Sequence, residues 1–120
     1  MKVLFATSEF ADFAKAGGLG EVSAGLPRAL RRLGVDARVL LPAYPEVIAR
    51  CSDITLVAHP GARGGITPCA IGEAITADGL PLYLVLEPSL YQRIGSPYAA
   101  PEGHDWADND IRFARLWASA

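Results

Sequence analysis

Hydrophobic and polar positions in the first 41 residues predict a strand, a helix and a second strand, in that order. Residues 3–5 form an apolar run typical of a central parallel strand that is covered on both faces. After a glycine-rich turn, apolar residues recur at helical spacings of three and four, at Leu19, Val22, Leu26, Leu30 and Leu33. Pro27 lies inside this pattern and predicts either a kink or a new helix start. Residues 36–41 form the second predicted strand.

The remainder of the chain is predicted to contain strands joined by hairpin turns, a long loop and a final helix. The β-leaning runs at residues 54–58, 66–75 and 80–86 are separated by glycine-containing turn sequences. Residues 87–106 are rich in proline and glycine, which predicts a loop with one helical turn near residues 89–92. A helix start at residues 108–110 precedes an apolar helical face. Because the chain ends within that pattern, we expect it to be a piece of a longer protein.

The strand, turn, helix and strand at the start form a βαβ unit, so the predicted fold class is α/β. A chain of 120 residues that is 51% hydrophobic and 20% charged supports one domain with one core. The formal net charge of −2, without a block of like charge, argues against nucleic acid or a membrane surface as a partner. The apolar runs are too short for a membrane span or a signal peptide, which predicts a cytoplasmic protein.

The segment with the most informative chemistry is the glycine-rich loop at residues 15–20, with the sequence K-A-G-G-L-G. It lies between the first strand and the first helix, where α/β sheets bind ligands. Gly17 and Gly18 would let the backbone approach an anion, and the helix start offers free amides and a partial positive charge. Lys15 adds a full charge. The loop fits a phosphate site, or equally a turn that only joins the strand to the helix.

Two other phosphate-binding motifs fit this loop poorly. A dinucleotide fingerprint aligned on Gly18 and Gly20 places Ser23 at the third glycine, and no acidic residue follows the second strand to hold a ribose. A P-loop needs a lysine after the glycines, whereas Lys15 precedes them. We therefore expect neither a nicotinamide cofactor nor a P-loop nucleotide.

Four stretches of the chain match the spaced motifs of one known family. Residues 15–19 (K-A-G-G-L) match a K-x-G-G-L motif, and residues 35–45 (V-D-A-R-V-L-L-P-A-Y-P) match a second strand and its exit. Residues 90–98 (L-Y-Q-R-I-G-S-P-Y) match an L-Y-x-R-x-G-x-P-Y stretch, and residues 108–113 (D-N-D-I-R-F) match a helix start with one inserted residue. Across all 120 residues the chain resembles the bacterial glycogen synthase and plant starch synthase family.

This resemblance implies a retaining glycosyltransferase of the GT-B type. Residues 1–120 would form the amino-terminal portion of its catalytic domain, Rossmann-like and truncated, with the carboxyl-terminal nucleotide-binding domain absent from the chain. The implied reaction transfers glucose from ADP-glucose to the non-reducing end of an α-1,4-glucan such as glycogen, without a cofactor or a metal. The implied location is the bacterial cytoplasm, or the plastid for a plant protein. Because the second domain is needed for closure, we expect this chain alone to be inactive.

The resemblance also implies substrate-binding roles for five residues, while the catalytic residue stays unknown. Lys15 would contact the nucleotide diphosphate, with the backbone of Gly17 and Gly18 close to the phosphates and the transferred sugar. Glu21 stands where the family usually has an aspartate. Its carboxylate either accepts hydrogen bonds from sugar hydroxyls or is only a first-turn acid that the helix dipole stabilises. Tyr98 either binds near the sugar and acceptor or packs within its loop.

A non-catalytic α/β module that binds a phosphate or a polysaccharide is the alternative function. A metal site is a further reading of residues 108–110, because a D-x-D pair can bind a divalent metal together with a nucleotide sugar. The amphipathic pattern that follows favours a helix cap with a first-turn acid instead. Glucose transfer by an enzyme that contains this chain would separate catalysis from binding.

Overall fold

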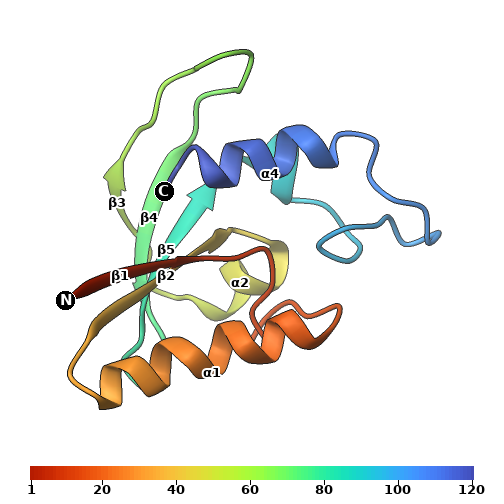
Figure 1. Ribbon diagram of the computed structural model, residues 1–120. Coiled ribbons are helices and arrows are strands. Elements are labelled where there is room, and N and C mark those ends of the chain that lie inside the picture. The colour runs from red at the N-terminus through yellow and green to blue at the C-terminus, as the bar shows by residue number, and fades with distance from the viewer.

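The computed structural model describes residues 1–120 as a mixed five-stranded sheet with helices on both sides (Figure 1). The strands are β1 (Lys2–Ala6), β2 (Asp36–Pro42), β3 (Thr55–Ala58), β4 (Ala70–Ile75) and β5 (Pro81–Leu86). Their order across the sheet is β1-β2-β5-β4-β3. The pairs β1 with β2 and β2 with β5 are parallel, and both pairs that involve β4 are antiparallel. The predicted α/β class is confirmed.

β1 is an edge strand, which corrects the prediction that residues 3–5 form a central one. Its one partner in the sheet is β2, and Leu4 remains 42% exposed. The parallel pairing itself is as predicted, with Val3 opposite Ala37. An apolar run indicates that the side chains favour burial, but not which neighbours the chain supplies. Here β5 pairs with the far side of β2 and leaves the outer side of β1 free.

The antiparallel part of the sheet confirms the predicted hairpin connections. β3, β4 and β5 follow one another in the chain and lie side by side in the sheet. Gly79 forms the turn between β4 and β5 at a φ of +89°, in the left-handed region that glycine adopts without strain. β4 begins at Ala70 rather than at residue 66, because Pro68 has no amide hydrogen to contribute to the strand ladder.

The helix α1 (Gly18–Arg32) runs through Pro27 without a break, so the predicted alternative of a new start there is wrong. Its buried residues are its small ones, Gly20, Ser23, Ala24 and Pro27, and they let the helix lie close to β2. The apolar stripe that correctly predicts the helix faces outward instead. Leu19, Val22 and Leu26 are 44%, 52% and 43% exposed. The helical period thus identified the element but not its buried face.

Three shorter helices complete the structure: α2 (Pro45–Arg50), α3 (Pro88–Tyr91) and α4 (Asn109–Trp117). α3 is the helical turn predicted near residues 89–92, and α4 is the predicted final helix. α2 was missed because six residues are too few to display an apolar period; a proline in its first turn was the available signal. α1 and α4 lie on opposite sides of the sheet (Figure 1). None of the helices combines the length and the apolar composition that crossing a bilayer requires.

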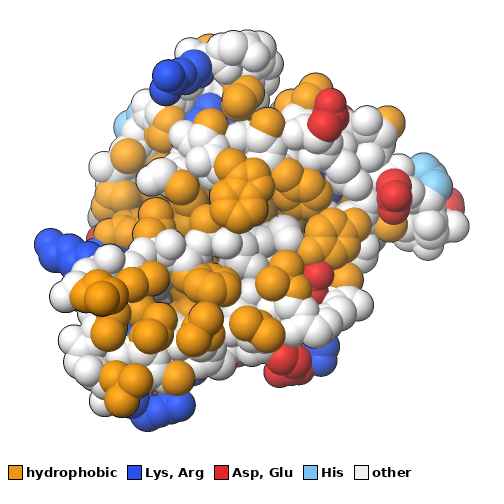
Figure 2. Space-filling view, viewed as in Figure 1, with side chains coloured by type: hydrophobic (Ala, Val, Ile, Leu, Met, Phe, Trp, Pro, Cys, Tyr) orange, Lys and Arg blue, Asp and Glu red, His pale blue; other side chains and the backbone are white.

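The hydrophobic core surrounds the middle strands, and one face of the molecule stays apolar outside it. Val39 and Leu41 of β2 and Leu82 and Leu84 of β5 are fully buried. Figure 2 shows hydrophobic side chains gathered over α1 and over the strip between α1 and α4. We call the exposed apolar side chains of α1 the apolar face; its members are Leu19, Val22, Leu26 and Leu33.

Candidate functional site

The loop that follows β1 is the centre of the predicted site. It spans residues 7–17, between the carboxyl end of β1 and the first turn of α1. Phe10 is fully buried, and its backbone exchanges two hydrogen bonds of 2.9 Å with Ala14. The Ala11 amide donates to the Gly20 carbonyl at 3.0 Å. The loop is therefore folded onto itself and tied to the start of α1.

Glu9 is the buried carboxylate of this loop, and it accepts hydrogen bonds from two distant parts of the chain. Its Oε2 accepts from the amides of Ala16 and Gly17, each at 3.0 Å, and its Oε1 accepts from the Tyr98 hydroxyl at 2.6 Å. Burial raises the pKa of the Glu9 carboxyl, but these hydrogen bonds lower it by more, so the net pKa lies below the ordinary 4.5. Glu9 is therefore ionised at neutral pH.

Lys15 and Glu21 form an ion pair at the surface beside this loop. The Lys15 Nζ lies 2.5 Å from the Glu21 Oε1. The two side chains are 46% and 63% exposed, so both charges stay in contact with water. An exposed pair of this kind is weak, because solvent screens the attraction and ordering two long side chains costs entropy. The structure thus pairs two of the five predicted site residues. An anion of higher charge can displace Glu21 from Lys15, because the pair is weak.

The glycines of the loop have different surroundings. A Cβ atom built on Gly17 or Gly18 would meet no heavy atom within 4 Å. A Cβ atom on Gly20 would lie 3.0 Å from Cγ of Lys15. Packing therefore accounts for Gly20, whereas the other two glycines border open space through which a ligand can approach the backbone. The first two amides of α1 donate no hydrogen bond within the chain and remain available to such a ligand.

Tyr98 reaches this loop from the segment between α3 and α4. Its hydroxyl, which donates to Glu9, also lies 2.7 Å from the Ser8 Oγ. Its ring packs against Phe113 of α4, with the ring centroids 5.7 Å apart at an angle of 55°. Burial raises the pKa of the Tyr98 phenol, and the hydrogen bond to Glu9 raises it further. The phenol therefore keeps its proton, and its hydroxyl is engaged within the chain.

The acidic triplet at residues 108–110 starts α4, but the predicted side-chain cap hydrogen bond is absent. Asp108 occupies the N-cap position, and its two oxygens instead accept hydrogen bonds of 2.7 Å and 2.6 Å from the Arg93 guanidinium. This hydrogen bonding lowers the pKa of the Asp108 carboxyl. A bidentate ion pair with a guanidinium is stronger than a hydrogen bond from a neutral backbone amide. This explains why Asp108 pairs with Arg93 instead of capping the helix. Asp110 is the first-turn acid, as predicted.

α4 also holds the loop that carries Tyr98. The Asn109 side chain donates to the Tyr98 carbonyl at 2.8 Å. Arg112 is 1% exposed, and its guanidinium donates to the carbonyls of Leu90 and Pro97, each at 2.8 Å. Asn109 and Arg112, which belong to the D-N-x-x-R-F motif, therefore hold the backbone of the preceding loop through hydrogen bonds to its carbonyls.

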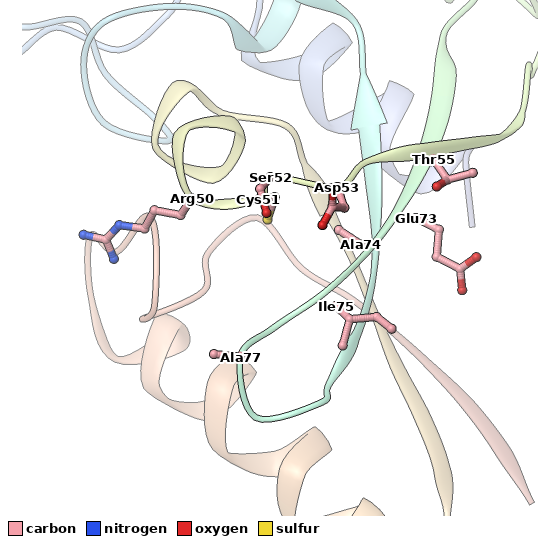
Figure 3. Close-up of a pocket in the computed structure, with 9 residues that line it drawn as sticks. All are labelled: Arg50, Cys51, Ser52, Asp53, Thr55, Glu73, Ala74, Ile75 and Ala77. Carbon is pink, nitrogen blue, oxygen red and sulfur yellow. The ribbon is translucent and has the colours of Figure 1, made fainter.

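Two cavities differ in their relation to the predicted residues. The cavity of about 590 Å³ in Figure 3 lies between the segment after α2 and the strands β3 and β4. None of the five predicted site residues lines it. A smaller cavity of about 260 Å³ has Lys15 in its wall, with Tyr44, Arg93 and Pro97 from other parts of the chain. Lys15 is the one predicted site residue in its wall, so the smaller cavity borders the candidate site at Lys15.

Ser8 and Glu9, which precede the glycine turn, are part of the motif that resembles the family, but sequence reasoning assigned Glu9 no role. The available signal was an acidic residue three positions after the first strand and shortly before a glycine turn, which a solvent-exposed acid would produce equally well. Its partners Gly17 and Tyr98 lie 8 and 89 positions further along the chain. Residues 9–17 form an irregular loop and Tyr98 is remote in the chain, so no helical or strand period relates Glu9 to these partners, and the contacts become visible only in three dimensions.

A family model, curated sequences and a solved structure match this chain. The family model for the starch synthase catalytic domain matches residues 2–120. The glycogen synthases of Pseudomonas savastanoi pv. phaseolicola and Pseudomonas putida are 51% and 52% identical over 119 residues, which is 99% of this chain and 24% and 23% of theirs. The catalytic domain of starch synthase IV from Arabidopsis thaliana, bound to ADP and acarbose, matches with a TM-score of 0.74 at 29% identity, covering 98% of this chain and 24% of that one.

The sequence motifs, the mixed sheet and the family model agree over nearly the whole chain. The chain spans about a quarter of the length of the curated relatives that it matches. With 119 of its 120 residues inside the family model, it belongs to the starch synthase catalytic domain family.

Proposed function

We propose that residues 1–120 are the amino-terminal part of a two-domain, retaining glycosyltransferase that transfers glucose from ADP-glucose to the non-reducing end of an α-1,4-glucan. One observation carries the proposal: Lys15, the open backbone of Gly17 and Gly18, and Tyr98 converge on the loop at the carboxyl end of β1. The carboxyl ends of parallel strands are where α/β folds bind ligands. Family membership supports glucosyl transfer as the chemistry.

Lys15 and the start of α1 form the positively charged part of the proposed site. The free amides of the first helical turn and the Lys15 ammonium both favour an anion. As the glycosidic bond to the donor breaks, negative charge builds on the departing diphosphate, and a positive charge fixed beside it stabilises the transition state more than the ground state. The diphosphate would replace Glu21 as the partner of Lys15 and would release the Glu21 carboxylate.

Glu21 and Tyr98 are the proposed sugar contacts. The Glu21 side chain is 63% exposed, and its carboxylate, once free of Lys15, can accept hydrogen bonds from sugar hydroxyls. The Tyr98 hydroxyl is held by Glu9 and Ser8, so the aromatic ring is the part that would lie against a glucan. In the absence of substrate, the helix dipole also stabilises the charge of Glu21, because Glu21 lies in the first turn of α1.

The substrates and the compartment are proposed from the relatives. The matching Arabidopsis structure is bound to ADP, which supports an adenine nucleotide sugar as the donor. The Pseudomonas relatives are named glycogen synthases, which supports glycogen as the acceptor and the bacterial cytoplasm as the location. Most nucleotide contacts and the closure of the site are assigned to the second domain, so the 120-residue chain alone is expected to be inactive.

A chimeric enzyme tests this function. The chimera carries residues 1–120 in place of the matching 119 residues of the Pseudomonas savastanoi pv. phaseolicola glycogen synthase. We expect it to incorporate radiolabelled glucose from ADP-glucose into glycogen, with less from UDP-glucose and none when the 120-residue chain is used alone. The unmodified relative is the positive control. A folded chimera that binds glycogen but transfers glucose from neither donor would instead indicate a non-catalytic binding module.

A further inference from the structure

Glu9 occupies an unusual position for a carboxylate, at the end of β1 with 4% of its surface exposed. Burying an ionised group is unfavourable unless its oxygens are hydrogen-bonded. Here both oxygens are used, one by the amides of Ala16 and Gly17 and the other by the Tyr98 hydroxyl. One side chain therefore fixes both the glycine loop, which is proposed to bind the donor, and Tyr98, which is proposed to contact the glucan.

We infer that Glu9 is a positioning residue of this site, holding the glycine loop and Tyr98 in one arrangement without touching the substrate. This role rests on the proposed function, since it concerns the geometry of the same donor site. The burial of Glu9 and the full use of its oxygens leave no room for a substrate contact. Its effect on the reaction must pass through the backbone of the loop and through Tyr98.

The hydrogen bonds to Glu9 determine which loop amides can face an anion. The amides of Ala16 and Gly17 point to the Glu9 carboxylate and are not available to a phosphate. The amides of Gly18 and Leu19 have no acceptor within the chain. With the amides of Ala16 and Gly17 taken by Glu9, the free donors next along the chain are the first two amides of α1, which a helix start leaves without a partner.

The second oxygen of Glu9 determines the orientation of Tyr98. Because the phenol proton is donated to Glu9, the Ser8 hydroxyl must be the donor in its 2.7 Å hydrogen bond with the phenol oxygen. The Ser8 carbonyl in turn accepts from the Tyr44 hydroxyl at 2.9 Å. This network leaves the Tyr98 ring with one orientation relative to the glycine loop.

The length of the glutamate side chain matters for this role. An aspartate is one methylene shorter and cannot reach both the loop amides and the Tyr98 hydroxyl from the same backbone position. A glutamine keeps the length and retains one acceptor oxygen for the loop amides, while its NH₂ group can donate to the Tyr98 oxygen. Glu9→Gln is therefore the conservative variant, and Glu9→Ala removes both connections.

Steady-state kinetics of the chimera test the inference. The KM for ADP-glucose does not depend on how much of the enzyme is folded, so a change in KM reports on the geometry of the site. We expect Glu9→Ala to raise this KM by about 10- to 100-fold, as small displacements of binding groups do. Glu9→Gln should lie between Glu9→Ala and the wild type. Glu102→Gln is the matched control, because the Glu102 side chain is 71% exposed, and its KM should equal that of the wild type.

A double variant and hydrogen exchange provide independent readouts. If Tyr98 acts through Glu9, adding Tyr98→Phe to Glu9→Ala should raise the KM for glycogen no further, whereas Tyr98→Phe alone should raise it. Hydrogen–deuterium exchange in the 120-residue chain should be faster over residues 14–20 in Glu9→Gln, because a hydrogen bond to a neutral amide is weaker than one to a carboxylate.

Two results would overturn the inference. One is a wild-type KM in both Glu9 variants of an active chimera, even if the yield of folded protein falls. The other, if Glu9→Ala does not fold, is Glu9→Gln with unchanged KM and unchanged exchange over residues 14–20. An inactive wild-type chimera would count against the proposed function instead, so the two failures are distinguishable.

Discussion

At the scale of single residues, Gly17 and Gly20 are glycines for different physical reasons. Gly20 lies in the first turn of α1, where a Cβ would come within 3.0 Å of Cγ of Lys15 and 3.4 Å of Oε2 of Glu9. Gly17 has an extended backbone with a φ of −160°, which any residue can adopt, and open space on its side-chain side. Substituting each glycine therefore separates packing from ligand approach.

We expect Gly17→Ala to leave the stability of the 120-residue chain unchanged and to raise the KM of the chimera for ADP-glucose by about 10-fold, because the added methyl group occupies the path of the ligand. Gly20→Ala should instead destabilise the chain by about 1–3 kcal/mol through overpacking. Thermal melts and steady-state kinetics measure the two effects. A Gly17→Ala chimera with wild-type KM would show that no ligand approaches the backbone there.

The residues of the site differ in how far a sequence can predict them. Lys15, Gly17, Gly18 and Glu21 lie within seven positions, so local spacing and the preceding strand suffice to group them. Tyr98 required a family resemblance, because nothing near it in the chain indicates a contact with the loop. Glu9 belongs to the family motif but was assigned no role, since its role consists of contacts made by folding.

At the scale of elements, α4 holds the loop before it through hydrogen bonds from the buried side chain of Arg112. Arg112 is surrounded by aromatic rings, with its guanidinium carbon 5.9 Å from the Tyr91 ring centroid and 5.8 Å from that of Trp106. Burial lowers the pKa of Arg112, but the backbone carbonyls of Leu90 in α3 and Pro97 in the loop accept its hydrogen bonds. The loop and the helix therefore form one unit that holds Tyr98 against the loop after β1.

Arg112→Met tests this unit. The substitution removes the guanidinium and leaves the buried carbonyls of Leu90 and Pro97 without donors, so we expect a loss of about 3 kcal/mol in the free energy of unfolding. Urea denaturation of the 120-residue chain measures it, with the exposed Arg32→Met as the control. A loss no larger than that of the control would mean that the loop is held by other contacts.

The sequence predicted that these elements exist, because that depends on a local pattern. It did not predict their buried faces or their place in the sheet, because those depend on neighbouring elements. The helix period at residues 19–33 identified α1, yet its small residues rather than its leucines lie against β2. The apolar run at residues 3–5 identified β1 but placed it centrally, although the sheet leaves its outer side free. Periodicity encodes which side chains favour burial and does not encode what will cover them.

At the scale of the whole molecule, the apolar face is the main departure from an ordinary soluble surface. Leu33 at the end of α1 is 81% exposed, and Val22 in its middle is 52% exposed. Contiguous exposed apolar side chains on one face bind other apolar groups, whereas scattered ones are normal. The outer edge of β1 is also free and leaves backbone hydrogen-bonding groups unpaired.

We expect the 120-residue chain to bind the apolar dye ANS and to self-associate as its concentration rises. The double variant Val22→Gln/Leu26→Gln should bind less dye and stay monomeric at higher concentration, because it interrupts the apolar face without changing the buried side of α1. Ile94→Gln is the control, since Ile94 is 83% exposed but lies outside this face. Dye fluorescence and sedimentation provide the measurements. Equal dye binding by all three proteins would contradict this assignment.

The most direct test of the account is the turnover of the Lys15→Ala chimera with ADP-glucose and glycogen. Lys15 is half exposed and its ion pair with Glu21 is weak, so its removal should cost less than about 1 kcal/mol in stability. We expect kcat/KM to fall by about 100-fold, because the charge beside the departing diphosphate is lost. Lys2→Ala, which removes an exposed lysine from β1, is the matched control. Unchanged kcat/KM in a folded Lys15→Ala chimera would contradict the claim that this loop binds the donor.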